Sequence, residues 1–269
     1  MFGKIAVIGS GMMGGAIIKS LLKGSVAPSS VTAVDIDTKK LKEFEALGTK
    51  TGTDNAKAAK EAAIIFVIVK PGDVTKVLNG IKEESKDKLV ISVAATVPLS
   101  HLRKNVPESK LVRIMPNLCA MVQASYTAYC CTENLTIQDK ETVKGLLNMM
   151  GICEEVDEKY MDAITAISGS GPGYMSIIIE ALTYAGLKVG LPRSLALNCA
   201  AQTVLGTGKL VVDLQEEPAH IKDMTTTPGG TTIEAIYQIE QSQIRPAMMR
   251  AIEETTKKSQ IIREKLNLQ

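Results

Sequence analysis

A glycine-rich segment near the start of the printed sequence constrains the fold more than any other feature. Ile5 to Ile8 is an unbroken apolar run, which is typical of a parallel strand buried on both faces. The segment that follows, Gly9 to Gly14, matches the pattern GxGxxG and leads into apolar residues at helical spacing. The order of strand, glycines and helix predicts a unit that binds the diphosphate of a dinucleotide.

Each glycine of this segment has a separate expected role. Gly9 makes the tight turn, Gly11 lets the backbone approach the diphosphate, and Gly14 lets the helix pack close to the strand. The start of the helix offers free N–H groups and the positive end of its dipole to the phosphates. The cofactor-binding residues predicted here are Gly9, Ser10, Gly11, Met12, Met13 and Gly14.

An acidic residue at the end of the second predicted strand bears on the choice of cofactor. Asp35 follows the apolar residues Val31 to Val34 and lies 21 residues after Gly14. A carboxylate at this place holds the ribose hydroxyls of the adenosine and repels a 2′-phosphate. Asp35 therefore favours NADH, while Lys39 and Lys40 on the next helix leave NADPH open as the alternative.

Composition excludes several classes of protein. The chain has 269 residues, a net charge of +2, only 3% aromatic residues and no Trp, so neither a basic face nor stacking platforms for nucleic acid are indicated. Two His and five Cys without Cys-x-x-Cys spacing predict no metal site and no disulfide framework. We expect no signal peptide, no membrane segment and a cytoplasmic location.

Strand and helix patterns alternate through the first half of the chain. This alternation predicts an α/β fold whose domain over residues 1–158 contains a parallel, doubly wound Rossmann sheet. Two further strand patterns, near 125–131 and 153–156, flank a predicted helix, and their direction stays open. Ligands of such sheets bind beyond the carboxyl ends of the strands. Those ends are Gly9–Gly11, Asp35, Lys70–Pro71, Ala94–Ala95 and Pro116–Asn117.

The second half shows helical periodicity only. We predict an all-α domain over residues 159–269, with helices near 161–167, 172–189, 192–214, 231–241 and 244–266. The long apolar stretch from Leu195 to Val212 is more than one small domain can bury. It therefore predicts an intimate homodimer built from the helical half.

Two glycine-containing segments in the helical half are candidate ligand loops. Ser168–Tyr174 reads as an elbow between helices, in which Ser170 and its flanking glycines permit a close backbone approach to the cofactor. Pro228-Gly229-Gly230 precedes Thr231, which forms a capping-box pattern with Glu234 and so marks a helix start. Free N–H groups and a positive dipole end there suit a small carboxylate.

Several motifs together resemble one family, pyrroline-5-carboxylate reductase. They cover essentially the whole chain and occur in the family's order: the Gly-Ser-Gly-Met-Met-Gly loop, Val69-Lys70-Pro71, Val93-Ala94-Ala95, Arg113-Ile114-Met115-Pro116-Asn117, Gly169-Ser170-Gly171-Pro172 and Pro228-Gly229-Gly230-Thr231-Thr232. The chain departs from the usual pattern at Leu118-Cys119, where Thr-Pro is common, and at Gly173, where Ala is common.

The resemblance implies a Rossmann domain followed by an all-α dimerisation domain, with assembly of dimers into decamers in some members. It implies NADPH- or NADH-dependent reduction of 1-pyrroline-5-carboxylate to L-proline, the last step of proline biosynthesis. By the same likeness, Asn55, Ile68, Val69, Lys70, Pro71, Val93, Ala94 and Ala95 also line the nucleotide. The substrate-binding residues implied are Asn117, Gly229, Gly230, Thr231 and Thr232.

The expected chemistry needs little from the protein. A protonated cyclic imine already accepts hydride, so a hydrogen bond between the Thr232 hydroxyl and the ring nitrogen is enough and makes this threonine the predicted catalytic residue. Two alternatives stay open: a β-hydroxyacid dehydrogenase-like oxidoreductase and a non-catalytic nucleotide-binding sensor. β-Hydroxyacid dehydrogenases resemble one another in a lysine four residues after the second glycine of the helical-domain loop. Counting from Gly171, this chain has Met175 at that position, so the proton donor expected of such an enzyme is missing.

Overall fold

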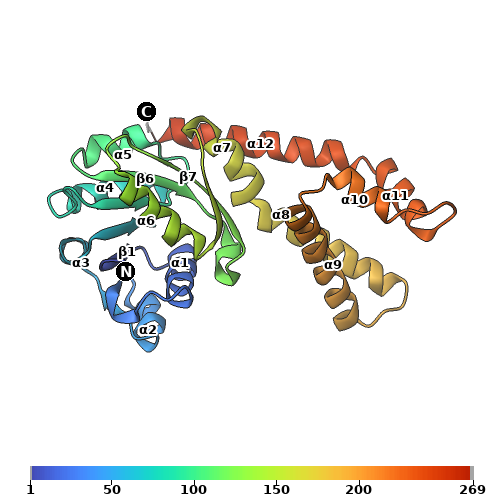
Figure 1. Ribbon diagram of the computed structural model, residues 1–269, viewed down its shortest axis with the longest axis horizontal. Coiled ribbons are helices and arrows are strands. Elements are labelled where there is room, and N and C mark those ends of the chain that lie inside the picture. Colours follow the sequence, from blue (N-terminus) through green and yellow to red (C-terminus); the bar gives the residue numbers. More distant parts are fainter. Residues whose placement is uncertain (1, 267–269) are drawn as a thin grey trace. The chain divides into compact units, whose positions relative to one another are not determined.

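The computed structural model describes residues 2–266, which form two compact units (Figure 1). The first unit runs to Ser170 and takes up the chain again from Glu254; the second is Gly171–Glu253. The boundary expected between residues 158 and 159 therefore differs from the division by contacts. Met1 and residues 267–269, which were included in the predicted domains, lie outside the described residues.

An eight-stranded sheet forms the first unit. Its strand order is β3-β2-β1-β4-β5-β6-β7-β8. The strands are β1 (Ile5–Ile8), β2 (Val31–Val34), β3 (Lys50–Gly52), β4 (Ile64–Val67), β5 (Leu89–Ser92), β6 (Lys110–Met115), β7 (Ser125–Cys131) and β8 (Gly151–Glu155). The sequence order of the strands, not their direction, reverses between β1 and β4, and doubly wound sheets bind their ligands at such a switch point.

The sheet is parallel through β6 but not beyond it. β7 pairs antiparallel with β6, and β8 runs parallel to β7. The parallel arrangement predicted from the strand–helix alternation is confirmed through β6, and the sequence pattern sets no direction for the two further strands. Only residues 116–124 join β6 to β7, and a return to a parallel neighbour needs a crossover of a dozen residues or more.

Helices cover both faces of the sheet, as the predicted fold class requires. On one face α1 (Met12–Lys23), α2 (Thr38–Ala46) and α6 (Ile137–Asn148) share an apolar core with the strands. On the other face α3 (Asn55–Glu61), α4 (Val74–Gly80) and α5 (Leu99–Asn105) do the same. Short 3-10 turns complete the unit: η1 (Pro28–Ser30), η2 (Pro71–Asp73), η3 (Leu118–Val122) and η4 (Glu158–Tyr160).

The segment that precedes the second unit is helical rather than a loop. The predicted helix at 161–167 appears as α7 (Met161–Ile164) followed by a π-helical segment, η5 (Thr165–Gly169). The connection predicted between helices at Ser168–Tyr174 is therefore not a loop: its first two residues belong to η5, and α8 begins at Gly171. The periodicity of a π turn is not visible in a sequence pattern built on 3.6 residues per turn.

The second unit is helical throughout residues 171–253, all of which the structure describes. It contains α8 (Gly171–Lys188), α9 (Arg193–Leu214), α10 (Pro218–Met224), α11 (Thr231–Gln241) and the first part of α12 (Ile244–Lys265). These confirm the predicted helices, and α10 is an addition that the sequence pattern did not reveal. α8 and α9 pack closely at Gly186, where an added Cβ would lie only 2.7 Å from the Cβ of Ala196.

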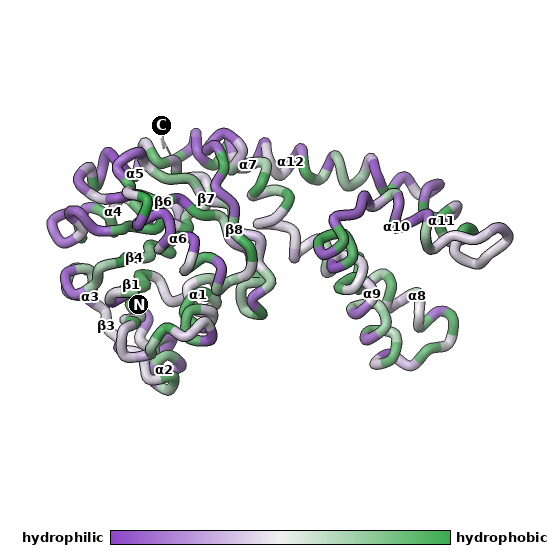
Figure 2. Tube along the Cα trace, viewed as in Figure 1, coloured by the Kyte–Doolittle hydropathy of each residue, from purple (hydrophilic) through white to green (hydrophobic). Residues whose placement is uncertain are grey.

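α8 and α9 carry many apolar residues (Figure 2), and a large share of these residues is exposed in the single chain. α9 has the length and hydropathy of a membrane-spanning helix, yet only 11% of that stretch is buried. An exposed apolar surface of this extent is typical of an interface with another protein or with a membrane. The exposed large apolar residues of the two helices are Met175, Ile177, Leu182, Tyr184, Leu195, Leu197, Leu205, Leu210, Val212 and Leu214.

Candidate functional site

The three glycines of the loop after β1 have different surroundings. Gly9 has φ +99°, and a Cβ there would lie 2.2 Å from the Ile68 carbonyl oxygen. A Cβ on Gly14 would lie 1.9 Å from the Gly9 carbonyl oxygen, so the protein's own packing requires both glycines. Gly11 has nothing within 4 Å of such a Cβ. The space beside Gly11 is open, as a cradle for a ligand would be.

The start of α1 fits an anion. Its N-cap is Gly11, no side chain caps the helix, and no acidic residue lies in its first turn. The first N–H groups of a helix have no partner within the helix and carry partial positive charge. With the open space at Gly11, these groups fit the diphosphate of a dinucleotide.

Asp35 has a structural role that sequence reasoning missed. Its side chain is 8% exposed. Its carboxylate accepts the backbone N–H of Ser10 and that of Asp37, each at 2.9 Å, and Lys40 Nζ lies 3.5 Å away. The carboxylate that is predicted to hold the ribose therefore also fastens the glycine loop to the end of β2.

The predicted nucleotide residues of the first unit gather at one edge of the sheet. Backbone hydrogen bonds continue past the strand ends: Gly9 N donates to Val34 O, Ile68 N to Ile8 O and Val93 N to Val67 O. The loops after β1, β2, β4 and β5 are therefore adjacent. Residues brought to this edge are Gly9–Gly14, Asp35, Ile68–Pro71 and Val93–Ala95.

Two other predicted cofactor residues are placed differently. Asn55 is the first residue of α3, next to its N-cap Asp54, and follows the edge strand β3. Ser170 is exposed at the end of η5 and donates its N–H to Thr165 O. Among the described residues, no hydrogen bond joins either residue to the glycine loop. Their nucleotide-binding role stays a prediction.

Asn117 follows β6 and is 8% exposed. Its side-chain oxygen accepts the N–H of Cys119 at 3.0 Å, which caps η3. Its side-chain nitrogen donates to both the carbonyl oxygen and the hydroxyl of Ser168, each at 3.1 Å. The carboxamide that is predicted to bind substrate is thus engaged within the first unit.

The threonine segment of the second unit begins a helix, though not by the predicted capping box. The N-cap residue of α11 is Gly230 and not Thr231, and no side chain caps the helix. The predicted capping box of Thr231 and Glu234 is therefore wrong, because the helix begins one residue earlier than that pattern requires. Gly230 N donates to Thr227 O, and Gly229 has φ +68°. Within residues 2–266, neither the Thr231 nor the Thr232 hydroxyl has a hydrogen-bond partner, which leaves both available to a ligand.

Cysteines and histidines show no sign of chemistry. Burial, then the charge of Glu158, raises the pKa of Cys130 to about 12; burial and a hydrogen bond to Glu155 raise that of Cys131 to about 11. These thiols are protonated at neutral pH. His101 contacts the Thr75 hydroxyl at 2.9 Å, and burial followed by Lys104 lowers its pKa. Among the described residues there is no cluster that could hold a metal ion.

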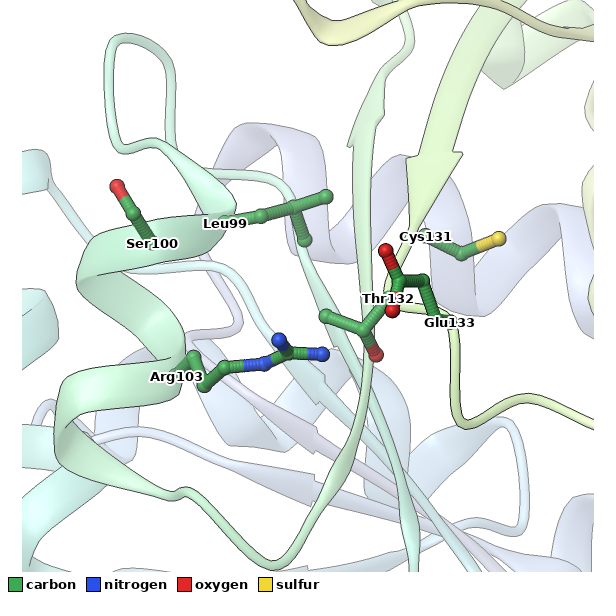
Figure 3. Close-up of a pocket in the computed structure, with 6 residues that line it drawn as sticks. All are labelled: Leu99, Ser100, Arg103, Cys131, Thr132 and Glu133. Carbon is green, nitrogen blue, oxygen red and sulfur yellow. The ribbon is translucent and has the colours of Figure 1, made fainter.

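A surface pocket of the first unit contains none of the predicted site residues. Figure 3 shows the Arg103 side chain reaching from α5 toward Thr132, with the carboxylate of Glu133 nearby. The other lining residues are Leu99, Ser100 and Cys131. We assign this pocket no part in the candidate site.

The fold and the glycine loop define a class, the nicotinamide-dinucleotide-dependent oxidoreductases. Comparison with known proteins narrows it. The family model for NADP oxidoreductase coenzyme F420-dependent matches residues 4–96, and the model for pyrroline-5-carboxylate reductase dimerisation matches residues 158–262. The chain belongs to the pyrroline-5-carboxylate reductase family, as the relatives below also show.

Relatives match over nearly the whole chain. The pyrroline-5-carboxylate reductase of Methanosarcina acetivorans is 38% identical and covers 97% of this chain and 98% of its own. The pyrroline-5-carboxylate reductase of Escherichia coli (strain K12) is 36% identical, and the match covers 96% of this chain and 97% of that protein. A crystal structure of Plasmodium falciparum pyrroline carboxylate reductase with NADP bound has a TM-score of 0.88, 31% identity, and coverage of 97% and 98%.

Proposed function

We propose that this chain reduces 1-pyrroline-5-carboxylate to L-proline, the last step of proline biosynthesis, with NADH or NADPH as the hydride donor. One observation carries the proposal. A Pro-Gly-Gly segment precedes α11, and the hydroxyls of Thr231 and Thr232 have no hydrogen-bond partner in the described part of the chain, whose other unit fits a dinucleotide. Relatives at 36–38% identity that bear this enzyme's name support it.

The first unit binds the cofactor in this proposal. The N-terminus of α1 and the backbone of Gly9–Gly14 hold the diphosphate, while the residues after β4 and β5 line the nicotinamide half. When bound, the reduced nicotinamide supplies the hydride. The cofactor residues are those of the glycine loop with Asp35, Asn55, Ile68–Pro71, Val93–Ala95 and Ser170.

Asp35 is the residue that we propose sets cofactor preference. Its carboxylate is held in place by two backbone N–H groups and would meet a 2′-phosphate with negative charge. Lys40 offsets this charge in part from 3.5 Å. We therefore expect NADH to be used well, although the Plasmodium falciparum relative binds NADP. Measuring kcat/KM for both cofactors tests this, and a strong NADPH preference would contradict it.

The second unit binds the imino acid. The N–H groups around Gly229 and Gly230, at the positive end of α11, and the Thr231 hydroxyl hold the substrate carboxylate. Thr232 lies one residue further into the helix, and its hydroxyl oxygen accepts a hydrogen bond from the ring N–H. The ring nitrogen of the protonated imine carries the proton already, so hydride addition to the C=N carbon gives the amine of proline without a strong acid.

Subunit association belongs to the second unit. The dimerisation model covers residues 158–262, and α8 and α9 expose the apolar surface that such an interface buries. We propose a cytoplasmic homodimer in which dimers assemble further, up to a decamer. Sedimentation velocity at micromolar concentration distinguishes dimer from decamer.

One assay tests the reaction against its alternatives. Oxidation of NADH and NADPH is followed with pyrroline-5-carboxylate, and reduction of the oxidised cofactors is followed with 3-hydroxyacids. We expect turnover only of the imine. Turnover of hydroxyacids would indicate the dehydrogenase alternative, and dinucleotide binding without any turnover would indicate a sensor.

A further inference from the structure

The chain passes from the first unit to the second directly after the π-helical segment η5. Ser170 N donates to Thr165 O at 2.9 Å, the five-residue spacing of a π turn, and α8 begins at Gly171. Single π turns are rare and are found mostly at functional sites. Some contact must therefore favour this turn over a regular α-helix.

Asn117 supplies that contact from the end of β6. Its side-chain nitrogen has two hydrogens, and these go to the carbonyl oxygen and the hydroxyl oxygen of Ser168, each at 3.1 Å. The Ser168 hydroxyl donates in turn to Tyr126 O at 3.3 Å on the neighbouring strand β7. η5 is thus bonded to two strands of the sheet.

Close packing holds the same turn. A Cβ on Gly169 would lie 3.3 Å from Met115 Sδ, so η5 rests against the end of β6 with little space between. Asn117 itself is held by Ser125, whose hydroxyl accepts its backbone N–H at 3.0 Å, and by Cys119, whose N–H its oxygen accepts. The carboxamide is therefore fixed at both of its polar atoms.

We propose that Asn117 is a positioning residue of the reaction and not a substrate ligand. Both of its N–H donors are used, and it acts through Ser168. By fixing Ser168 it holds η5, the segment from which the chain continues directly into α8. This proposal deepens the proposed function and rests on it. Its kinetic consequence is a lower rate of hydride transfer, with little change in either binding step.

The test uses the full chain and variants of both partners. Asn117→Asp keeps the size of the side chain and the oxygen that accepts the Cys119 N–H. It replaces the donating NH2 group by a second oxygen, which then faces the two acceptor oxygens of Ser168. Ser168→Ala is a milder change that removes one of the two acceptors. Ser30→Ala is the matched control, because its hydroxyl bonds only Ala27 O beside it. Stability, cofactor Kd, kcat and imine KM are measured for each.

Hydrogen exchange of the free protein reads the contact without any turnover. In Asn117→Asp we expect the Ser170 amide to exchange about tenfold faster or more, as for a lost hydrogen bond of ordinary strength. We expect kcat to fall about tenfold or more, because small misplacements are costly in hydride transfer. The cofactor Kd and imine KM should stay within about twofold.

A double variant separates coupling from independent effects. Asn117→Ala with Ser168→Ala should lower kcat little further than Asn117→Ala alone, since both remove the hydrogen bond between the carboxamide and the Ser168 hydroxyl. Three results would overturn the proposal: an imine KM raised with exchange unchanged, which means direct substrate contact; lower stability with kcat unchanged; or additive losses in kcat. A wild-type chain that does not reduce the imine would instead contradict the proposed function.

Discussion

Within the glycine loop, single residues separate folding from binding. Gly14→Ala places a Cβ against the Gly9 carbonyl oxygen at 1.9 Å, so we expect a loss of stability of about 2 kcal/mol or more. Gly11→Ala meets only open space, so stability should be kept while the cofactor Kd rises about tenfold or more. Thermal unfolding and NADH fluorescence titration check the pair. Unchanged cofactor affinity in Gly11→Ala would contradict the diphosphate site.

Thr232 is the residue on which the proposed chemistry depends. Thr232→Val keeps the branched shape and removes only the hydroxyl. We expect kcat/KM for the imine to fall roughly 10- to 100-fold, the effect of a hydrogen bond to a charged group. Cofactor affinity should barely change, because the glycine loop belongs to the other unit. Turnover at the wild-type rate would leave Thr232 as a helix-start residue without a chemical part.

Asp35 and Asn117 show where residue-level reasoning from the sequence reaches its limit. Spacing after the glycine loop predicts Asp35 as a ribose ligand, but it does not predict the hydrogen bond that Asp35 accepts from Ser10 N, which depends on the turn after β1. The motif containing Asn117 marks a strand end, yet its partner Ser168 lies 51 residues away in the chain. Contacts of that separation have no signal in a single sequence.

Helix α6 is held by a charged cap whose effect depends on pH. Burial acts to raise the pKa of Asp139, but hydrogen bonds from Lys110 and Thr136 outweigh it and lower the pKa below its ordinary value. A lowered folded-state pKa stabilises the protein above about pH 4 and loses that effect as pH falls through the folded value. Comparison of wild type and Asp139→Asn by thermal unfolding should show a difference at pH 7 that shrinks below pH 4.

The short turn η4 is joined to β6 by an ion pair. Arg113 is 1% exposed, and its guanidinium donates to Glu158 at 2.9 Å; Glu158 also accepts the N–H of Leu99 at the start of α5. Glu158→Gln would leave the Arg113 charge buried without a counter-charge. We expect a loss of about 2–3 kcal/mol by urea unfolding, reduced from the fully buried case because Glu158 is a third exposed. Glu141→Gln, an exposed site, should change little.

Element positions follow from the sequence where one physical period dominates. The buried strands β1, β2, β4 and β5 and the long helices α8, α9 and α11 lie where apolar runs and helical spacing predict them. Three features escape that reasoning. α10 is short, η5 follows a π period, and the antiparallel direction of β7 depends on the length of a connection.

At the scale of the whole molecule, association should depend on α9. Leu205 and Val212 are each 61% exposed in the single chain, in the region matched by the dimerisation model. Leu205→Glu with Val212→Glu should shift the sedimenting species to the monomer and lower activity. Cofactor affinity should remain, because the first unit carries the glycine loop. A variant that still sediments with the wild type would place the interface elsewhere.

The return of α12 to the first unit has a consequence for how the chain is made. Asp162 of α7 accepts hydrogen bonds from Ser259, at 2.8 Å, and from Arg263, about a hundred residues later in the sequence. A ribosome synthesises residues 171–253 before it reaches either partner. The helical unit is therefore complete in sequence while the sheet unit still lacks its last helix, so the unit begun first is the one finished last.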